Sequence, residues 1–234
     1  MRKTLSVGVI VGDNHHAGLA TICSLINQTR KPDQIFILEN PLKAKRLSVQ
    51  FPHLFSLMAW AEQRGTECSL RSVSALNLVQ ARVACEERLT GDLLLLSDGD
   101  HFYPPDYLER ACGYLADVEH GYYGCAVECL DSDTGLSALE STMALVTMTD
   151  DYVSGGSAVY TASLKGLYRK VLEYTTGLGD DRCWRALAKR DHNVSKGAYY
   201  PTAICHLATH SESKYPPSMS AKLIELCHTE LGSC

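Results

Sequence analysis

Two aspartates separated by one glycine, Asp98 and Asp100, are the residues of this chain best suited to chemistry. They follow four consecutive leucines, Leu93–Leu96, a run typical of a buried strand. Successive strand residues point to opposite faces, so both carboxylates fall on the same side. In open α/β sheets, ligands bind at the carboxyl ends of the strands. Two neighbouring hard oxygen donors can hold Mg²⁺ or Mn²⁺ while a diphosphate completes the coordination, so this pattern predicts a metal-diphosphate site.

The elements that must position these aspartates begin with a β-α-β unit. Leu5–Val11 is a short run rich in β-branched residues that ends in turn-forming residues. Apolar residues then recur at helical spacing over Ala17–Gln28, and Ile35–Leu38 follows as a second apolar strand. Such a unit favours a right-handed crossover onto a parallel sheet. The sequence therefore predicts an α/β fold with a mostly parallel central sheet flanked by helices.

Further elements are predicted from apolar periodicity and from turn residues. They are a helix over Leu76–Leu89, the strand Leu93–Leu96, a helix over Asp106–Leu115, a strand over Tyr122–Leu130, a helix over Ala162–Tyr174 and a helix from Asp180 to Lys189. Residues 43–67 and 211–234 have no evident function.

Composition limits the class of protein. The 22 basic and 27 acidic residues give a net charge of −5, so the chain has no overall basic field for nucleic acid or anionic membranes. No apolar run approaches the ~20 residues of a membrane span, and Leu5–Val11 is too short for a signal peptide. The ten cysteines are scattered, with no Cys-x-x-Cys, which favours reduced thiols over disulfides or zinc. We expect a cytoplasmic protein without a transmembrane segment.

Taken in order, several motifs resemble those of glycosyltransferases with the GT-A fold, in particular the inverting family 2. The motifs are Ser24-Leu25-x-x-Gln28-Thr29, Ala81-Arg82, and the block Gly91-Asp92-x-x-x-x-Ser97-Asp98-x-Asp100 followed by Pro104-Pro105-Asp106-Tyr107-Leu108. The last block is the motif most specific to this family. The resemblance covers Leu5 to His206 and implies a single GT-A domain over residues 1–210. Residues 211–234 are then a helical C-terminal extension, either packed on the domain or flexible.

The resemblance implies a nucleotide diphosphate sugar as donor and Mn²⁺ or Mg²⁺ as cofactor. It gives Asp100 and Asp98 as metal ligands, Asp98 also contacting the ribose, and His206 as a residue that joins the metal. Donor-binding residues implied by position in the motifs are Gly12, Asp13, Asn14, Glu39, Arg82 and Asp98. A diphosphate contact is expected for Arg82.

On the acceptor side, the resemblance points to Gly155-Gly156 and to the pair Asp180-Asp181. In the family the final carboxylate of this second motif is the general base, which assigns that role to Asp181. A neighbouring like charge on Asp180 would help to raise the pKa of the base. Two alternatives stay open: Asp180 is itself the base, or it caps the helix that begins there.

Four positions depart from the family pattern. Gly12 replaces a proline, Glu39 an aspartate and Val83 an asparagine, which leaves the nucleotide open. A uridine-type donor is favoured because the carboxylate of Glu39 can accept the hydrogen of uracil N3. Leu187 stands where an arginine is common. Three arginines are candidates to replace its charge: Arg182, Arg185 and Arg190.

The predicted function is transfer of a sugar, with a UDP-sugar as the favoured donor, to a hydroxyl-type acceptor. The acceptor is open between a small molecule, a glycan, a protein side chain and a modified nucleobase. One alternative is a nucleotidyltransferase acting on sugar phosphates, but that class needs a glycine-rich phosphate loop after the first strand, and Gly12–His16 is not one. Another alternative is a non-catalytic module that binds nucleotides or glycans.

Overall fold

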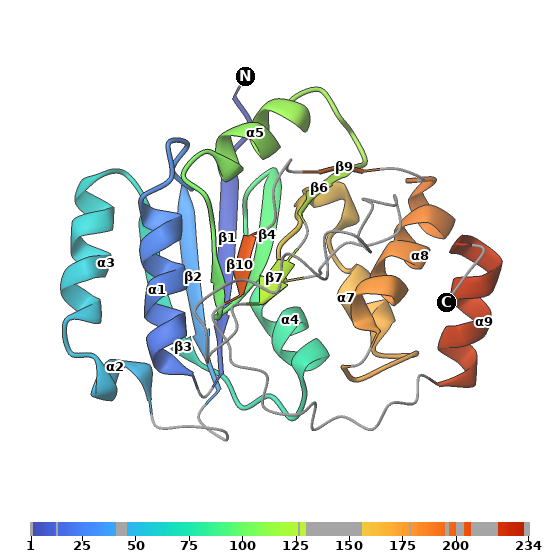
Figure 1. Cartoon of the computed structure of the whole chain (residues 1–234), viewed down its shortest axis with the longest axis horizontal. Helices are drawn as coiled ribbons and strands as arrows, with labels where there is room; N and C mark the ends of the chain where they lie inside the picture. Colours follow the sequence, from blue (N-terminus) through green and yellow to red (C-terminus); the bar gives the residue numbers. More distant parts are fainter. Residues whose placement is uncertain are drawn as a thin grey trace.

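Within the described residues, a seven-stranded sheet with helices on both faces forms the body of the protein (Figure 1). The structure is a computed structural model that describes residues 2–12, 14–40, 46–125, 127–129, 156–177, 179–194, 197–199, 204–206 and 220–231. The strands of this sheet lie in the order β3 (Glu67–Ser72), β2 (Gln34–Glu39), β1 (Leu5–Val11), β4 (Leu93–Asp98), β8 (Val159–Thr161), β6 (Tyr122–Gly124) and β9 (Ala198–Tyr199).

One strand of this sheet runs against the others. Strands β3, β2, β1 and β4 are parallel to one another, and β6 and β9 share their direction. Only β8 is antiparallel to its two neighbours, β4 and β6. The carboxyl ends of the six parallel strands therefore meet at one edge, and β8 starts from that same edge. The α/β fold and the mostly parallel sheet expected from the sequence are confirmed.

A second, three-stranded sheet lies beside this edge. It consists of β5 (His101–Phe102), β10 (Ile204–His206) and β7 (Val127–Cys129). Strand β10 is antiparallel to β5 and parallel to β7. In this register the Cα atoms of His206 and His101 face one another across the two strands.

Alternating leucines of β4 supply both layers of the core. Leu94 and Leu96 face the layer that contains α4 (Leu78–Glu86), α7 (Leu167–Val171), α8 (Asp180–His192) and α9 (Ala221–Leu231). Leu93 and Leu95 face the layer that contains α1 (His15–Ile26), the short α2 (Leu47–Gln50), α3 (Leu54–Gln63) and α5 (Tyr107–Tyr114). A strand buried on both faces needs a continuous apolar run, which explains the four leucines.

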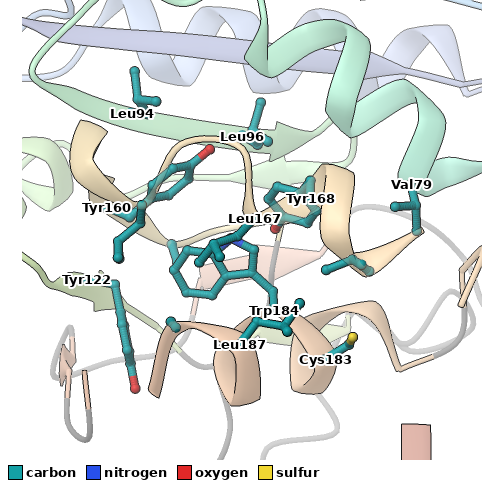
Figure 2. Close-up of a cluster of buried hydrophobic side chains, with 14 of the residues drawn as sticks. Val79, Leu94, Leu96, Tyr122, Tyr160, Leu167, Tyr168, Cys183, Trp184 and Leu187 are labelled. Atoms are coloured by element: carbon teal, nitrogen blue, oxygen red, sulfur yellow. The ribbon is translucent and has the colours of Figure 1, made fainter. Parts of the chain in front are cut away.

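An indole surrounded by phenol rings fills the first of these layers. Trp184 of α8 lies 5.3 Å from the ring of Tyr160, 5.9 Å from Tyr122 and 6.2 Å from Tyr168, measured between ring centroids. Figure 2 shows these rings together with Leu167 beneath strand β4. Such large aromatic contacts hold α8 against the sheet.

Two predicted elements differ from the structure. The strand predicted over Tyr122–Leu130 is two strands, β6 and β7, which belong to different sheets. The helix predicted over Ala162–Tyr174 is a 3₁₀ turn at Ala162–Leu164 followed by α7. Gly166 separates these two because its φ of +93° is a left-handed conformation that cannot continue a helix.

The carboxyl-terminal segment contains a helix that packs on the domain. Leu223, Leu226 and Cys227 of α9 are buried in the same apolar layer as Trp184. The predicted boundary at residue 210 lies outside the described residues. Among the helices that are described, none combines the length and the apolar character needed to cross a membrane.

Candidate active site

The turn after β4 holds the two aspartates at the carboxyl edge of the sheet. Asp98 is the last residue of β4, and Asp100 lies in the turn that leads to β5. Their side chains keep 27% and 26% of their surface exposed, so both are accessible to a ligand. Gly99 lies between them because a Cβ there would approach the carbonyl oxygen of Ile10 to 2.7 Å. The expectation that both acids lie at a strand end is met by the structure.

The backbone of Gly156, one of the two glycines predicted on the acceptor side, lies against Asp98. Its carbonyl oxygen accepts three hydrogen bonds: from the amide of Asp98 at 3.2 Å, from His101 Nδ1 at 2.8 Å and from the hydroxyl of Tyr103 at 3.0 Å. A Cβ on Gly156 would lie 2.1 Å from Asp98 Oδ2, so no other residue fits without displacement. Gly155 lies outside the described residues.

His101 and Tyr103 are site residues that the sequence analysis missed. Both side chains are buried, with 2% and 1% of the residue surface exposed. Donation from His101 Nδ1 fixes the tautomer, and its Nε2 lies 3.8 Å from Asp100 Oδ1. The hydroxyl of Tyr103 lies 2.9 Å from Ser97 Oγ. Their closeness to Asp98 in the sequence was the available signal.

Arg82 is a buried cation shared by two carboxylates. Its Nη2 donates to Asp98 Oδ2 at 3.0 Å, and its Nε lies 2.9 Å from Asp180 Oδ2. Its guanidinium also lies 5.5 Å from the centre of the Tyr168 ring. Although burial alone would lower it, the acidic groups around the guanidinium, first of all Asp98, raise the pKa of Arg82 well above its usual value. The side chain is therefore always charged.

Asp180 and Asp181 begin helix α8, after Gly179 in a left-handed conformation with φ of +77°. Asp180 is buried, and burial raises its pKa above the ordinary value despite the opposing effect of Arg82. Asp181 is partly exposed. The two ion pairs of Arg82 thus bring the predicted metal-site carboxylate and the predicted base region to one guanidinium.

Arg82 Nε and Asp180 Oδ2 contact each other as an ion pair without a hydrogen bond of good geometry. Of the other buried atoms of Arg82, Asp98 and Asp180, Nη1 of Arg82 and Oδ1 of Asp98 have no hydrogen-bond partner among the described residues. One is a cationic donor and the other an anionic acceptor. Buried polar atoms are normally satisfied, so these two are the atoms expected to bind a ligand.

Other predicted donor residues have local structural partners. Glu39 is buried; one carboxylate oxygen accepts from the amide of Leu47 at 2.7 Å and the other from the hydroxyl of Ser72. Asn14 caps α1 through a bond from the amide of Ala17 at 3.1 Å. Glu39 and Asp98 lie on strands that flank β1, which places their backbones roughly 10 Å apart.

The remaining predicted residues are placed only in part. Gly12 is exposed with open space around its Cα, and Asp13 lies outside the described residues. The backbone of His206 faces that of His101, next to Asp100, whereas its side chain lies outside the described residues. The candidate arginines of α8 differ in setting: Arg185 is buried and Arg190 pairs with Asp191 at 2.7 Å.

Replacing Gly156 by alanine is expected to lower the free energy of unfolding by about 1–3 kcal/mol, because the added methyl overpacks against Asp98. Gly113 of α5 is the matched control, since a Cβ there meets nothing within 4 Å. Gly113→Ala should leave stability unchanged or raise it by up to about 1 kcal/mol. Urea unfolding measures the free energy of unfolding of both variants. Equal changes in the two would contradict the close contact between Gly156 and Asp98.

Arg82→Met should lower the free energy of unfolding by roughly 3–5 kcal/mol, because it leaves two carboxylates without their buried counter-charge. Arg169→Met is the control: Arg169 pairs with Glu87 on the surface, and its loss should cost less than about 1 kcal/mol. Adding Asp180→Asn to Arg82→Met should recover part of the loss. A double variant no more stable than Arg82→Met would remove the coupling between Arg82 and Asp180.

Comparisons with known proteins identify the fold. No family model matches the sequence, and no curated protein is significantly similar to it. Among solved structures, the mannosyltransferase PcManGT from Pyrobaculum calidifontis, in complex with GDP-Man and Mn²⁺, matches with a TM-score of 0.64 and 14% identity. This match covers 90% of the present chain and 59% of PcManGT.

S. aureus TarS 1-349 in complex with UDP-GlcNAc matches with a TM-score of 0.62 and 12% identity, over 97% of this chain and 66% of that one. The complex of the same protein with UDP matches with a TM-score of 0.64. The chain thus spans 59% to 66% of the length of these proteins. The expectation from the sequence is confirmed at the level of architecture: the protein has the GT-A glycosyltransferase fold.

Proposed function

We propose that the protein is an inverting glycosyltransferase that moves a sugar from a nucleoside diphosphate donor to a hydroxyl group. The observation that carries this proposal is the Asp98–Arg82–Asp180 cluster at the carboxyl edge of the sheet. It joins the acids suited to a metal-diphosphate complex to the acids suited to proton transfer. The proteins with the same fold, PcManGT and TarS, were solved with GDP-Man and with UDP-GlcNAc.

Asp98 and Asp100 are the residues that would hold a divalent metal. The donor set fits, because Mg²⁺ and Mn²⁺ prefer oxygen ligands and are commonly bound by one or two carboxylates together with substrate phosphates. Asp98 Oδ1 is buried and lacks a hydrogen-bond partner among the described residues. No group of three or more His, Cys, Asp or Glu side chains within that part of the chain is placed to hold a metal alone. When bound, the metal would neutralise charge on the departing diphosphate.

The protein side chains perform the remaining steps. Arg82 Nη1, a buried donor without a hydrogen-bond partner in the described part of the chain, would bind the diphosphate by a charge-assisted hydrogen bond. Asp181 would take the proton of the acceptor hydroxyl while the sugar carbon is attacked from the face opposite the diphosphate. Asp181 suits this better than Asp180, whose carboxylate is buried against Arg82.

The donor base and the cellular location are two further parts of the same proposal. Both oxygens of Glu39 already accept hydrogen bonds, so the preference for uridine inferred from that residue stays a prediction. The seven cysteines whose side chains the structure describes are free thiols, and five of them are buried, which supports a reducing, cytoplasmic setting. The acceptor class stays open.

Asp100→Asn is expected to abolish Mn²⁺-dependent binding of UDP or GDP while leaving the melting temperature without ligand unchanged, because it removes a charged oxygen ligand at an accessible turn. Calorimetric titration of UDP and GDP, with Mn²⁺ and with EDTA, measures this and also tests the base preference. Glu225→Gln, which likewise removes one exposed carboxylate but lies on α9, is the matched control and should bind like the parent. Parent-like Mn²⁺-dependent affinity in Asp100→Asn would refute the metal assignment.

Asp181→Asn should retain donor binding but lose a factor of roughly 10² to 10⁴ in rate, or about 3–5 kcal/mol of transition-state stabilisation. Because the acceptor is open, the assay follows transfer to water: release of free sugar from UDP-GlcNAc and from GDP-mannose. Asp180→Asn should be impaired less. An inactive Asp180→Asn beside an active Asp181→Asn would exchange the two roles. Donor binding by the parent without any sugar release would favour a non-catalytic binding module.

A further inference from the structure

Two adjoining cavities lie at the edge of the sheet opposite to Asp98. Their volumes are about 470 Å³ and about 260 Å³, and both are lined by Arg2, Thr29 and Arg30. The combined space falls in the size range of small-molecule sites. In Figure 1 this edge is marked by the amino terminus, which lies next to α5.

The amino ends of three neighbouring strands build this edge. Arg2 precedes β1, Arg30 and Lys31 precede β2, and Arg64 precedes β3. Because β1 has seven residues at about 3.3 Å each, the cavities lie roughly 20 Å from Asp98. A ligand there cannot touch the candidate active site, so the cavities need an explanation of their own.

The smaller cavity is lined by four cations and one carboxylate, that of Asp33. Asp33 Oδ2 accepts from the amide of Leu5 at 2.8 Å and from Arg30 Nη2 at 2.7 Å, which commits both Asp33 and Arg30. Although burial opposes it, these bonds lower the pKa of Asp33, so its charge balances that of Arg30.

Four cations thus face one carboxylate in this cavity, and three of the four form no ion pair with a described residue; the charge of Arg2 only adds to the effects that lower the pKa of Asp33. Within the described residues, the side chains of Arg2 and Lys31 make neither an ion pair nor a hydrogen bond, and Arg64 contacts only the face of Trp60, 4.6 Å away. They come from three separate segments that meet only in the folded chain. An excess of cations around a small cavity favours an anionic ligand, and arginine suits phosphate oxygens.

The larger cavity has a different lining. The carboxylates of Glu109 and Asp117 lie here beside the cations of Arg2, Lys3 and Arg30, so that opposite charges largely offset each other, and the small Gly113 and Ala116 leave the space open. The hydroxyl of Thr29 donates to Glu109 Oε2 at 2.8 Å. Carboxylates accept hydrogen bonds from hydroxyl groups but repel a second anion. This cavity therefore suits the uncharged, hydroxylated part of a ligand.

We propose that these cavities form a second site, which binds a phosphate monoester of a hydroxylated compound. The phosphate lies among Arg2, Lys31 and Arg64, and the hydroxylated part lies beside Thr29, Glu109 and Asp117. Nucleic acid does not fit, because the adjoining carboxylates and the net charge of −5 oppose a polyanion. The site is separate from the donor site and does not depend on the proposed transferase activity.

The test is calorimetric titration of the full chain with glucose 6-phosphate as probe, in EDTA to silence any metal-dependent binding. The parent should bind, and the double variant Arg2→Ala/Arg64→Ala should bind about tenfold or more weakly, because it loses two charged donors. Arg71→Ala/Arg88→Ala is the matched control, since it removes two exposed arginines elsewhere and should bind like the parent. Equal loss in both double variants would show a general charge effect and overturn the proposal.

Three further arms define the ligand and separate this site from the active site. Inorganic phosphate should bind more weakly than glucose 6-phosphate, and glucose should not bind measurably. Asp100→Asn should bind glucose 6-phosphate like the parent, whatever its effect on nucleotides. Failure of the parent to bind glucose 6-phosphate overturns the proposal. If the parent protein then sediments with phosphatidylglycerol vesicles, the cations bind a lipid headgroup and not a soluble phosphate monoester.

Discussion

The site depends on one buried guanidinium that two carboxylates share. Arg82 comes from α4, Asp98 from β4 and Asp180 from α8, so two consecutive elements and a third one far along the chain meet at one charge. A buried carboxylate without a partner costs several kcal/mol, so a displacement of any one of the three elements would be strongly unfavourable. The aromatic layer around Trp184 then holds α8 at the distance that this cluster requires.

When both acids are ionised, the cluster has a net charge of about −1, because a single cation, Arg82, faces Asp98 and Asp180. Burial and the neighbouring Asp98 both raise the pKa of Asp180. An incoming cation or a proton relieves this imbalance. The carbonyl oxygen of Gly156 adds a second constraint on Asp98, because it accepts a hydrogen bond from the amide of Asp98. The side chains of His101 and Tyr103 bond to the same oxygen and hold it in place. Electrostatics and backbone hydrogen bonding therefore set the position of the same residue independently.

Local features of the fold were predictable from the sequence, whereas pairings across the fold were not. Leu5–Val11 and the placement of Asp98 and Asp100 after a buried strand follow from apolar runs and turn residues, which act over a few positions. The division of Tyr122–Leu130 between two sheets does not, because the residue types in this segment do not determine with which strand each half pairs.

The same limit applies to the candidate site. The resemblance implies that Arg82 contacts the diphosphate, but the ion pair of Arg82 with Asp180 depends on how α4 and α8 pack, which no local spacing encodes. Glu39 was expected to contact the nucleobase of the donor. In the structure its carboxylate accepts a hydrogen bond from the amide of Leu47, the first residue of α2. A residue type limits the bonds that a side chain can form, and tertiary packing chooses among them.

The reversed direction of β8 has a consequence for the position of Asp98. The parallel strands end at the edge of the sheet that contains Asp98, whereas β8 begins there. Gly156, which precedes β8, accepts a hydrogen bond from the amide of Asp98. Gly156 therefore lies against the candidate metal ligand Asp98 just before the chain joins the sheet at Val159. The position of Asp98 is thus tied to the start of a strand that is far away in the sequence.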